Sequence, residues 1–202
     1  MPVMDKSAEK SCVVHLQPGR EQRVAVVFSC PGRHEEAAGH PAAGSTGRNL
    51  DRLLALVGEG LGRSDLCREN ITITNAWPTV EYRARTGRSE ATSNEVTAAG
   101  NIERLERELG EVTDFVIFCG ERAKAVSARL RLKHSPGFVF VRHLGLRGLS
   151  LIRRDLDGEP IIAASRQACA GGKLDKKQVQ RGNTEKRLEV LAQSVLAQLK
   201  GG

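Results

Sequence analysis

The chain has 202 residues, of which 40% are hydrophobic, enough for one α/β domain with a sizeable core. Its formal net charge of +7 favours a polyanionic partner, with nucleic acid first, although an inert basic surface also fits the charge. No apolar run approaches the ~20 residues of a membrane span, and residues 1–12 lack the layout of a secretion signal. We therefore expect a cytoplasmic protein with no membrane partner.

Four short apolar runs, rich in β-branched residues and phenylalanine, are typical of buried strands. They are residues 23–29, 71–75, 114–120 and 137–143. Helical periodicity follows at residues 45–57, 96–110 and 121–132, and again in a last helix that carries Leu188 to Leu199. Ser45 or Thr46 is expected to cap the first helix, and Asn183 or Thr184 the last.

Two polar segments show no core periodicity. Residues 81–95 are expected to form an exposed loop, and residues 171–182 a basic linker. Strands that alternate with helices predict a single three-layer α/β domain over residues 23–202, after an N-terminal extension at 1–22. The central sheet should be mostly parallel, with four to five strands and helices on both faces.

The cysteines are widely spaced. No two of them form a Cys-x-x-Cys pair, so neither a zinc site nor a disulfide framework is indicated, and we expect no metal. The five are Cys12, Cys30, Cys67, Cys119 and Cys169.

Ligand sites in such sheets gather at the carboxyl ends of the strands, here "FSCPG", "TNAWP", "CGE" and "RHLGLRG". The segment "GHPAAGST" after the first strand has P-loop spacing, which raises a nucleotide-binding alternative. Ser45 stands at the lysine position, however, and the segment begins ten residues after the strand, whereas a P-loop follows its strand directly. Nucleotide binding is therefore the weaker reading.

Taken in order, the four strand ends resemble the uracil-DNA glycosylase superfamily over residues 24–196. The matching segments are "FSCPGRHE", "GHPAAG", "ITITNAWP", "DFVIFCGERAKAV" and "HLGLRGLS". The resemblance implies a monofunctional glycosylase that flips an altered base out of double-stranded DNA and leaves an abasic site. No cofactor is expected, because the close cysteine pair of the iron–sulfur branch is missing. We also expect a monomer.

Hydrolysis of an N-glycosidic bond requires the same residue types. An N-glycosidic bond breaks through an oxocarbenium-like sugar and an anionic leaving base, so a donor must face that base. His143 is the candidate donor, and the alternative is a histidine that bonds only to the backbone. Asn75 can pair with a pyrimidine edge, and the alternative is an Asx turn. We interpret both as functional because they fall at matching strand ends.

The water-orienting group is less clear from the sequence. Relatives place an aspartate before the motif proline, where this chain has Cys30, or a glutamate one position earlier, where it has Ser29. Glu35 is the matched acid that remains and is our candidate, with Glu36 and Ser29 as alternatives. Either glutamate can instead be a solvated loop carboxylate.

Ala42 stands where relatives place a phenylalanine that stacks on uracil. Stacking is worth roughly 1–3 kcal/mol, so the pocket must use another ring such as Phe28, or accept a different base. We expect the base to be held by Phe28, Ser29, Cys30, Ala42 and Asn75. A bulky modified pyrimidine, such as glucosylated 5-hydroxymethylcytosine in phage DNA, and plain uracil or another deaminated base both remain open.

DNA contacts are expected from the loop after His143, with Leu146 as a wedge and Arg147 beside it, and from Gly44, Ser45 and Gly47. The arginines at 83, 85 and 88 either contact DNA or belong to a solvated loop. A different class of function, a non-catalytic binder of modified DNA with the same fold, stays open at this point.

Overall fold

The computed structural model describes residues 13–163 and 176–201. Cys12, Cys169, most of the expected extension and the first part of the expected basic linker lie outside this range. Within it, five strands form one sheet in the order β1-β3-β2-β4-β5. The strands are β1 (Leu16–Gln17), β2 (Val24–Phe28), β3 (Thr72–Asn75), β4 (Phe115–Cys119) and β5 (Gly137–Val141).

All neighbouring strands are parallel except β1, which pairs antiparallel with β3 at one edge. The four apolar runs are thus confirmed as strands, each within two residues of its predicted ends, and the mostly parallel sheet is confirmed as well. β1 has no apolar run of its own, so periodicity did not predict it, although it joins the sheet from within the expected extension.

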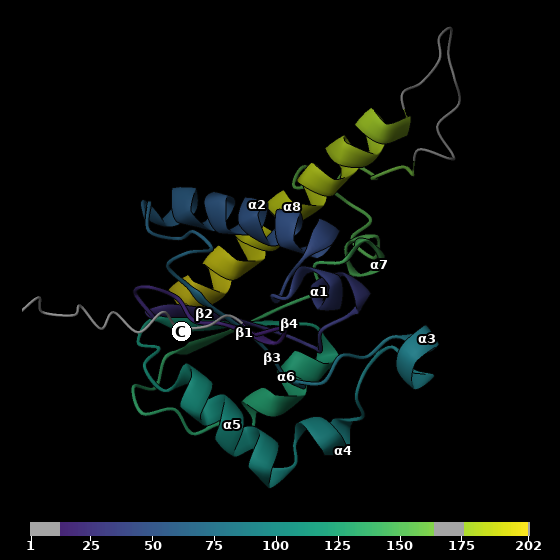
Figure 1. The fold of residues 1–202 in the computed structure, drawn as a ribbon. Coiled ribbons are helices and arrows are strands. Elements are labelled where there is room, and N and C mark those ends of the chain that lie inside the picture. The colour runs from purple at the N-terminus through teal and green to yellow at the C-terminus, as the bar shows by residue number, and fades with distance from the viewer. Residues whose placement is uncertain (1–12, 164–175, 202) are drawn as a thin grey trace, which may run out of the picture.

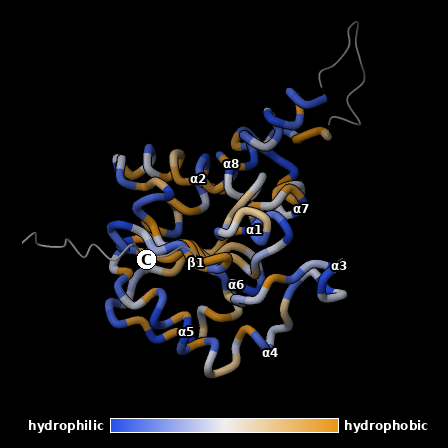
Figure 2. The backbone as a smooth tube through the Cα atoms, viewed as in Figure 1, coloured by the Kyte–Doolittle hydropathy of each residue, from blue (hydrophilic) through white to orange (hydrophobic). Residues whose placement is uncertain are grey.

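Helices cover both faces of the sheet (Figure 1). The first face packs against α2 (Gly44–Leu61) and α8 (Lys176–Gly201), and the second against α5 (Ala99–Leu109) and α6 (Glu121–Ser127). In β2, Val24, Val26 and Phe28 point to the first face, whereas Ala25 and Val27 point to the second. A central strand must be apolar on both sides, which explains its continuous hydrophobic run (Figure 2).

Short helices occupy the connections at the carboxyl edge. They are α1 (Arg33–Ala38), α3 (Arg83–Thr86), α4 (Ser93–Val96) and α7 (Leu146–Leu149). The prediction of a loop over residues 81–95 is therefore wrong, because α3 and most of α4 lie within it. The helix predicted over residues 96–110 is confirmed as α5, which begins later than expected, at Ala99, because Val96 is the last residue of α4.

Four helix ends differ from expectation. Ala43, not Ser45 or Thr46, caps α2 in an extended conformation, and Gly62 ends it with a left-handed φ of 66°. Helix α6 stops at Ser127 rather than 132. Helix α8 begins by Lys176, so Asn183 and Thr184 lie inside it, and the expected linker is partly helical. A polar helix has no apolar period, and periodicity therefore could not place this start.

Candidate active site

The carboxyl ends of β2 and β3 lie side by side. Phe28 is in register with Asn75, and the chain beyond them stays paired, because Trp77 N–H donates to the Ser29 carbonyl at 2.9 Å. Ser29 and Asn75 are both almost fully buried. The two residues therefore form one buried corner at the edge of the sheet.

The ends of β4 and β5 complete that corner. Gly120 follows β4 with a φ of +97°, and a Cβ there would lie 3.4 Å from His143 Cβ and 3.5 Å from Ser29 Oγ. A side chain at residue 120 would fill the space beside these two groups. All four strand ends thus meet at one site, as the sequence predicted.

Ser29 and Asn75 each present an unpaired polar atom. Ser29 Oγ and Asn75 Oδ1 are buried and have no hydrogen-bond partner within the described residues. An Asx turn would use Asn75 Oδ1 to accept the Trp77 N–H, but that N–H donates to Ser29 instead. Because unpaired buried polar atoms are rare in native proteins, the pair points to a polar ligand.

His143 is neutral and has a defined tautomer. Burial lowers the pKa of His143, an effect opposed by the negative charges of Glu90 and Glu35. Its Nδ1 accepts the Gly145 N–H at 2.9 Å, so the proton of the neutral ring is on Nε2. The Phe28 ring lies edge-on to it at 6.0 Å between centroids. His143 can thus donate a hydrogen bond from Nε2 without carrying a charge.

A buried network holds the backbone of Asn75. Arg104 on α5 donates to the Asn75 carbonyl at 2.9 Å and to Glu108 Oε2 at 2.6 Å. Glu108 also accepts from the Thr74 hydroxyl and contacts His15, just before β1. Sequence reasoning missed this network. The one available signal is the i, i+4 Arg–Glu pair on an otherwise amphipathic helix.

The carboxylate of Glu35 ties two loops together. Its Oε2 accepts the Gly32 N–H at 3.0 Å, and its Oε1 accepts the Ala43 N–H at 3.1 Å. The neighbouring Glu36 accepts from the Tyr82 hydroxyl and pairs with Arg85. Both glutamates lie in α1 and have partners within the protein, although the Glu36 side chain is still 34% exposed. Of the three water-orienting candidates, only Ser29 has a side-chain oxygen without a hydrogen-bond partner among the described residues.

Cys30 does not replace the family aspartate as an anion. Burial raises the pKa of Cys30 to about 12, and the carboxylate of Glu90 adds to the effect. The thiol stays protonated and donates weakly to the Ser89 carbonyl, with 3.7 Å between sulfur and oxygen. Segment 81–95 therefore lies against Cys30 and brings the carboxylate of Glu90 near the site, which sequence reasoning did not foresee.

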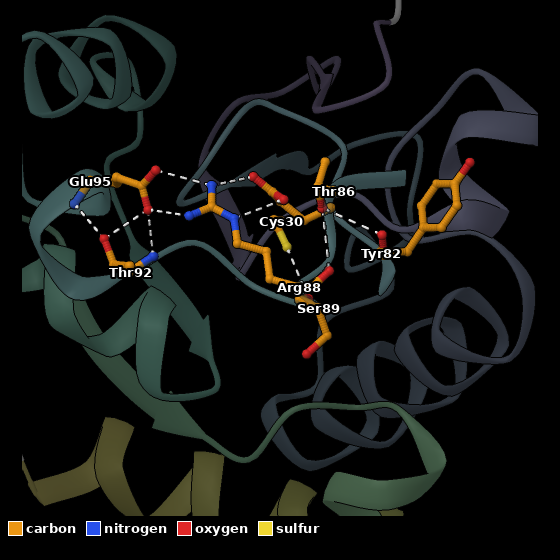
Figure 3. Close-up of polar contacts among 8 residues, drawn as sticks. Cys30, Tyr82, Thr86, Arg88, Ser89, Thr92 and Glu95 are labelled. Atoms are coloured by element: carbon orange, nitrogen blue, oxygen red, sulfur yellow. Dashed lines mark hydrogen bonds and ion pairs between the residues drawn. The ribbon is translucent and has the colours of Figure 1, made fainter. Parts of the chain in front are cut away.

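An ion cluster around Arg88 holds this segment in place (Figure 3). Arg88 pairs with Glu81, whose side chain is buried, and with Glu95, which also caps α4 through Thr92. The Glu81 N–H donates to the Pro31 carbonyl at 2.9 Å. Arg88 and Arg85 thus pair with carboxylates of the protein itself, which makes them poor candidates for DNA contact although both side chains are partly exposed.

Ala42 occupies a strained and buried position. Its φ is +50°, in the left-handed region that non-glycine residues rarely adopt, and Arg68 donates to its carbonyl at 2.9 Å. The methyl group is only 3% exposed and belongs to the core with Phe28. The small residue at 42 is therefore packed against the core, so room for a bulky base must come from the rest of the site.

The expected DNA-contacting residues lie together beyond this corner. Gly47 approaches the Ala42 carbonyl so closely that a Cβ would lie 2.1 Å from its oxygen. Asn49, one turn on, donates to the Leu144 carbonyl at 2.7 Å and so joins α2 to the loop after His143. Leu146 is 48% exposed at the start of α7, as a wedge requires. Gly44, Ser45 and Arg147 are also accessible.

Across residues 13–163 and 176–201, no three histidine, cysteine or acidic side chains cluster as a metal site would require. The helices described there are all too short or too polar to cross a bilayer. Cys30, Cys67 and Cys119 are free thiols.

A mostly parallel sheet with Asn75, Ser29 and His143 at its carboxyl edge defines an α/β protein whose candidate site lies at the strand ends. Residues 17–178 match the family model of the Uracil DNA glycosylase superfamily, and the chain belongs to that superfamily. No curated protein matches the chain significantly. Membership supports a DNA glycosylase type of function and DNA as the partner.

Proposed function

We propose that this protein is a monofunctional DNA glycosylase that excises an altered pyrimidine flipped out of double-stranded DNA. The observation that supports this most is the buried pair of unpaired atoms, Ser29 Oγ and Asn75 Oδ1, beside a neutral His143. A flipped base supplies polar edges to such atoms, and its exclusion from water strengthens each hydrogen bond.

The roles follow from where charge develops. As the bond between the sugar carbon and the base nitrogen breaks, its electron pair moves onto the base, and His143 Nε2–H stabilises the resulting anion. Asn75 holds the base edge by its amide. The oxygen of a water molecule then bonds to the sugar carbon, and the water releases one proton, which balances the protonation of the departed base.

Ser29 and Glu35 act on the attacking water and on the sugar. The free Ser29 hydroxyl accepts a hydrogen bond from the attacking water, and the fixed negative charge of Glu35 stabilises the cationic sugar while its oxygens stay bonded to Gly32 and Ala43. Phe28, edge-on to His143, supplies the aromatic surface that Ala42 lacks. Cys30 contacts the base as a neutral thiol.

The substrate is either a deaminated base such as uracil or a bulky pyrimidine such as glucosylated 5-hydroxymethylcytosine of phage DNA. The missing aromatic at residue 42 favours a base other than uracil, while the burial of its methyl group adds no room. Excision of a phage base would make the protein an antiviral defence enzyme. We further propose that it works as a cytoplasmic monomer.

The test is an abasic-site assay. Wild type and His143→Ala are incubated with duplexes that contain uracil, hypoxanthine, 5-hydroxymethylcytosine or its glucosylated form, and cleavage by alkali reports abasic sites. We expect product from at least one duplex and a loss of about 10²–10³-fold in rate for His143→Ala. Binding to modified DNA without product from any duplex would instead identify a non-catalytic binder.

Two further variants separate the roles at the water. Ser29→Ala should lower the rate without lowering stability, because Ser29 Oγ makes no bond within the described residues. Glu35→Gln should lower both the rate and the stability. The glutamine NH₂ group cannot accept a hydrogen bond, so one of the two backbone N–H groups loses its acceptor. An unchanged rate in Ser29→Ala, with a stable fold, would remove the serine from the mechanism.

A further inference from the structure

The first turns of α8 extend beyond the sheet, next to α7 (Figure 1). Residues 176–187 rise roughly 18 Å at 1.5 Å per residue. Their basic sequence lies at the side of the molecule where the wedge residue Leu146 is exposed. A protruding helix of this kind needs either a core to cover or a partner to contact.

The inward stripe of α8 changes character along the helix. In its second half, Leu188, Leu191 and Val195 are buried against the sheet and α2. The same stripe continues toward the N-terminus, at intervals of three and four residues, as Thr184 and Arg181. A stripe that turns from apolar to cationic cannot extend the core, so the first turns are built for contact with something polar.

These turns form one wall of a groove. The opposite wall contains Ser45 and Arg48 from the start of α2, and Leu146 lies along it. Ser45 and Leu146 already belong to the expected DNA surface. The groove therefore continues that surface past the wedge.

The mouth of the groove has an excess of positive charge. Arg48 and Arg181 are exposed, and neither side chain makes an ion pair or hydrogen bond within residues 13–163 and 176–201. Farther along the helix, by contrast, Glu185 pairs with Arg52. Arg52 is thus neutralised where α8 meets the body of the protein, whereas Arg48 and Arg181 have no partner among the described residues.

We propose that Arg48 and Arg181 bind the phosphate backbone of the DNA strand that flanks the flipped nucleotide. The partner is duplex DNA, because the cationic groove adjoins the wedge and carries charge opposite to phosphate. This inference rests on the proposed function for the position of the DNA, since Leu146 must enter the duplex for the flank to reach α8.

The test measures binding without turnover. The double variant Arg48→Ala with Arg181→Ala is compared with a charge-matched control, Arg107→Ala with Arg129→Ala, whose exposed arginines lie by α5 and α6 on the opposite face. Affinity for a duplex with a stable abasic analogue is measured by fluorescence anisotropy over a series of salt concentrations. Circular dichroism verifies that each variant is folded.

We expect the groove variant to lose about 0.9 from the slope of log K against log salt for each phosphate contact, or roughly 1.8 for both. The control should keep the slope of wild type. Truncating the duplex on the α8 side of the analogue should weaken wild type but not the groove variant. An unchanged slope in the groove variant, or an equal loss in the control, would overturn the inference.

The two proposals can fail separately. If no duplex yields abasic sites but the slope of log K against log salt still becomes smaller in the groove variant, glycosylase activity is rejected and phosphate binding in the groove is supported. If abasic sites form normally and the slope does not change, the enzyme stands and the groove is rejected.

Discussion

Two segments line the carboxyl edge of the sheet, and they are held by different forces. Segment 29–47 is held by close backbone contacts, by the hydrogen bonds that two backbone N–H groups donate to the Glu35 carboxylate, and by the buried methyl group of Ala42. Segment 81–95 is held by the ion cluster around Arg88 (Figure 3). The first is close-packed around Ala42 and Gly47, where an added Cβ on Gly47 would meet the Ala42 carbonyl, whereas the second depends on charge and should respond to pH.

The largest effect is expected from added volume in the first segment. In Gly47→Ala the new Cβ would lie only 2.1 Å from the Ala42 carbonyl oxygen, so either α2 or the backbone at Ala42 must shift. Overpacking of this kind costs about 1–3 kcal/mol, or about 2–4 °C in Tm for each kcal/mol. Thermal unfolding measures it. Gly100→Ala on α5, where a Cβ meets nothing within 4 Å, is the control and should not lose stability.

Removing the central cation should open the second segment without unfolding the domain. In Arg88→Met the buried Glu81 carboxylate loses its partner, so amide hydrogen exchange over residues 82–96 should accelerate several-fold while β2 and β4 stay protected. Arg83→Met is the control, because the exposed Arg83 side chain has no partner within the described residues. Equal protection of the segment in both variants would contradict the ion-cluster account.

The same cluster gives the second segment a pH dependence. Arg88 lowers the pKa of Glu81 from its usual 4.5. A lowered carboxylate pKa stabilises the folded state above the unfolded value, so this contribution is complete at neutral pH and is lost as the pH falls below about 4.5. Hydrogen exchange of the segment should accelerate over that range in wild type, and less so in Arg88→Met.

The smallest effect is expected on the pKa of His143, which charges from both segments, Glu35 and Glu90, influence. The lowered pKa of His143 puts the acidic limb of the rate profile below pH 6.5, because protonation of Nδ1 removes the acceptor of the Gly145 N–H that orients the ring. Glu90→Gln removes a charge that raises this pKa, so the limb should move to still lower pH. Glu103→Gln on α5 serves as the control. A shift to higher pH in Glu90→Gln would refute the assigned electrostatics.

The sequence predicted the parts of the site that follow an apolar strand. Asn75 and His143 come at or just after strand ends, and the carboxyl ends of parallel strands must meet at one edge, so their convergence could be inferred. The role of Glu35 could not, because the partners of its two oxygens depend on how the loop folds back. The same holds for Arg104, which reaches the Asn75 carbonyl from α5.

Local sequence by itself determined four of the five strands, their burial on both faces and the residue types at their ends, because near neighbours in the chain decide which side of a strand points inward. Only the tertiary structure decided which polar atoms are paired. Ser29 and Asn75 keep buried oxygens without a partner among the described residues, the side chains of Glu35 and Arg88 are paired, and α8 begins well before its apolar stripe. Ion pairs and hydrogen bonds between distant residues depend on distance and direction in space, and these have no period in the sequence.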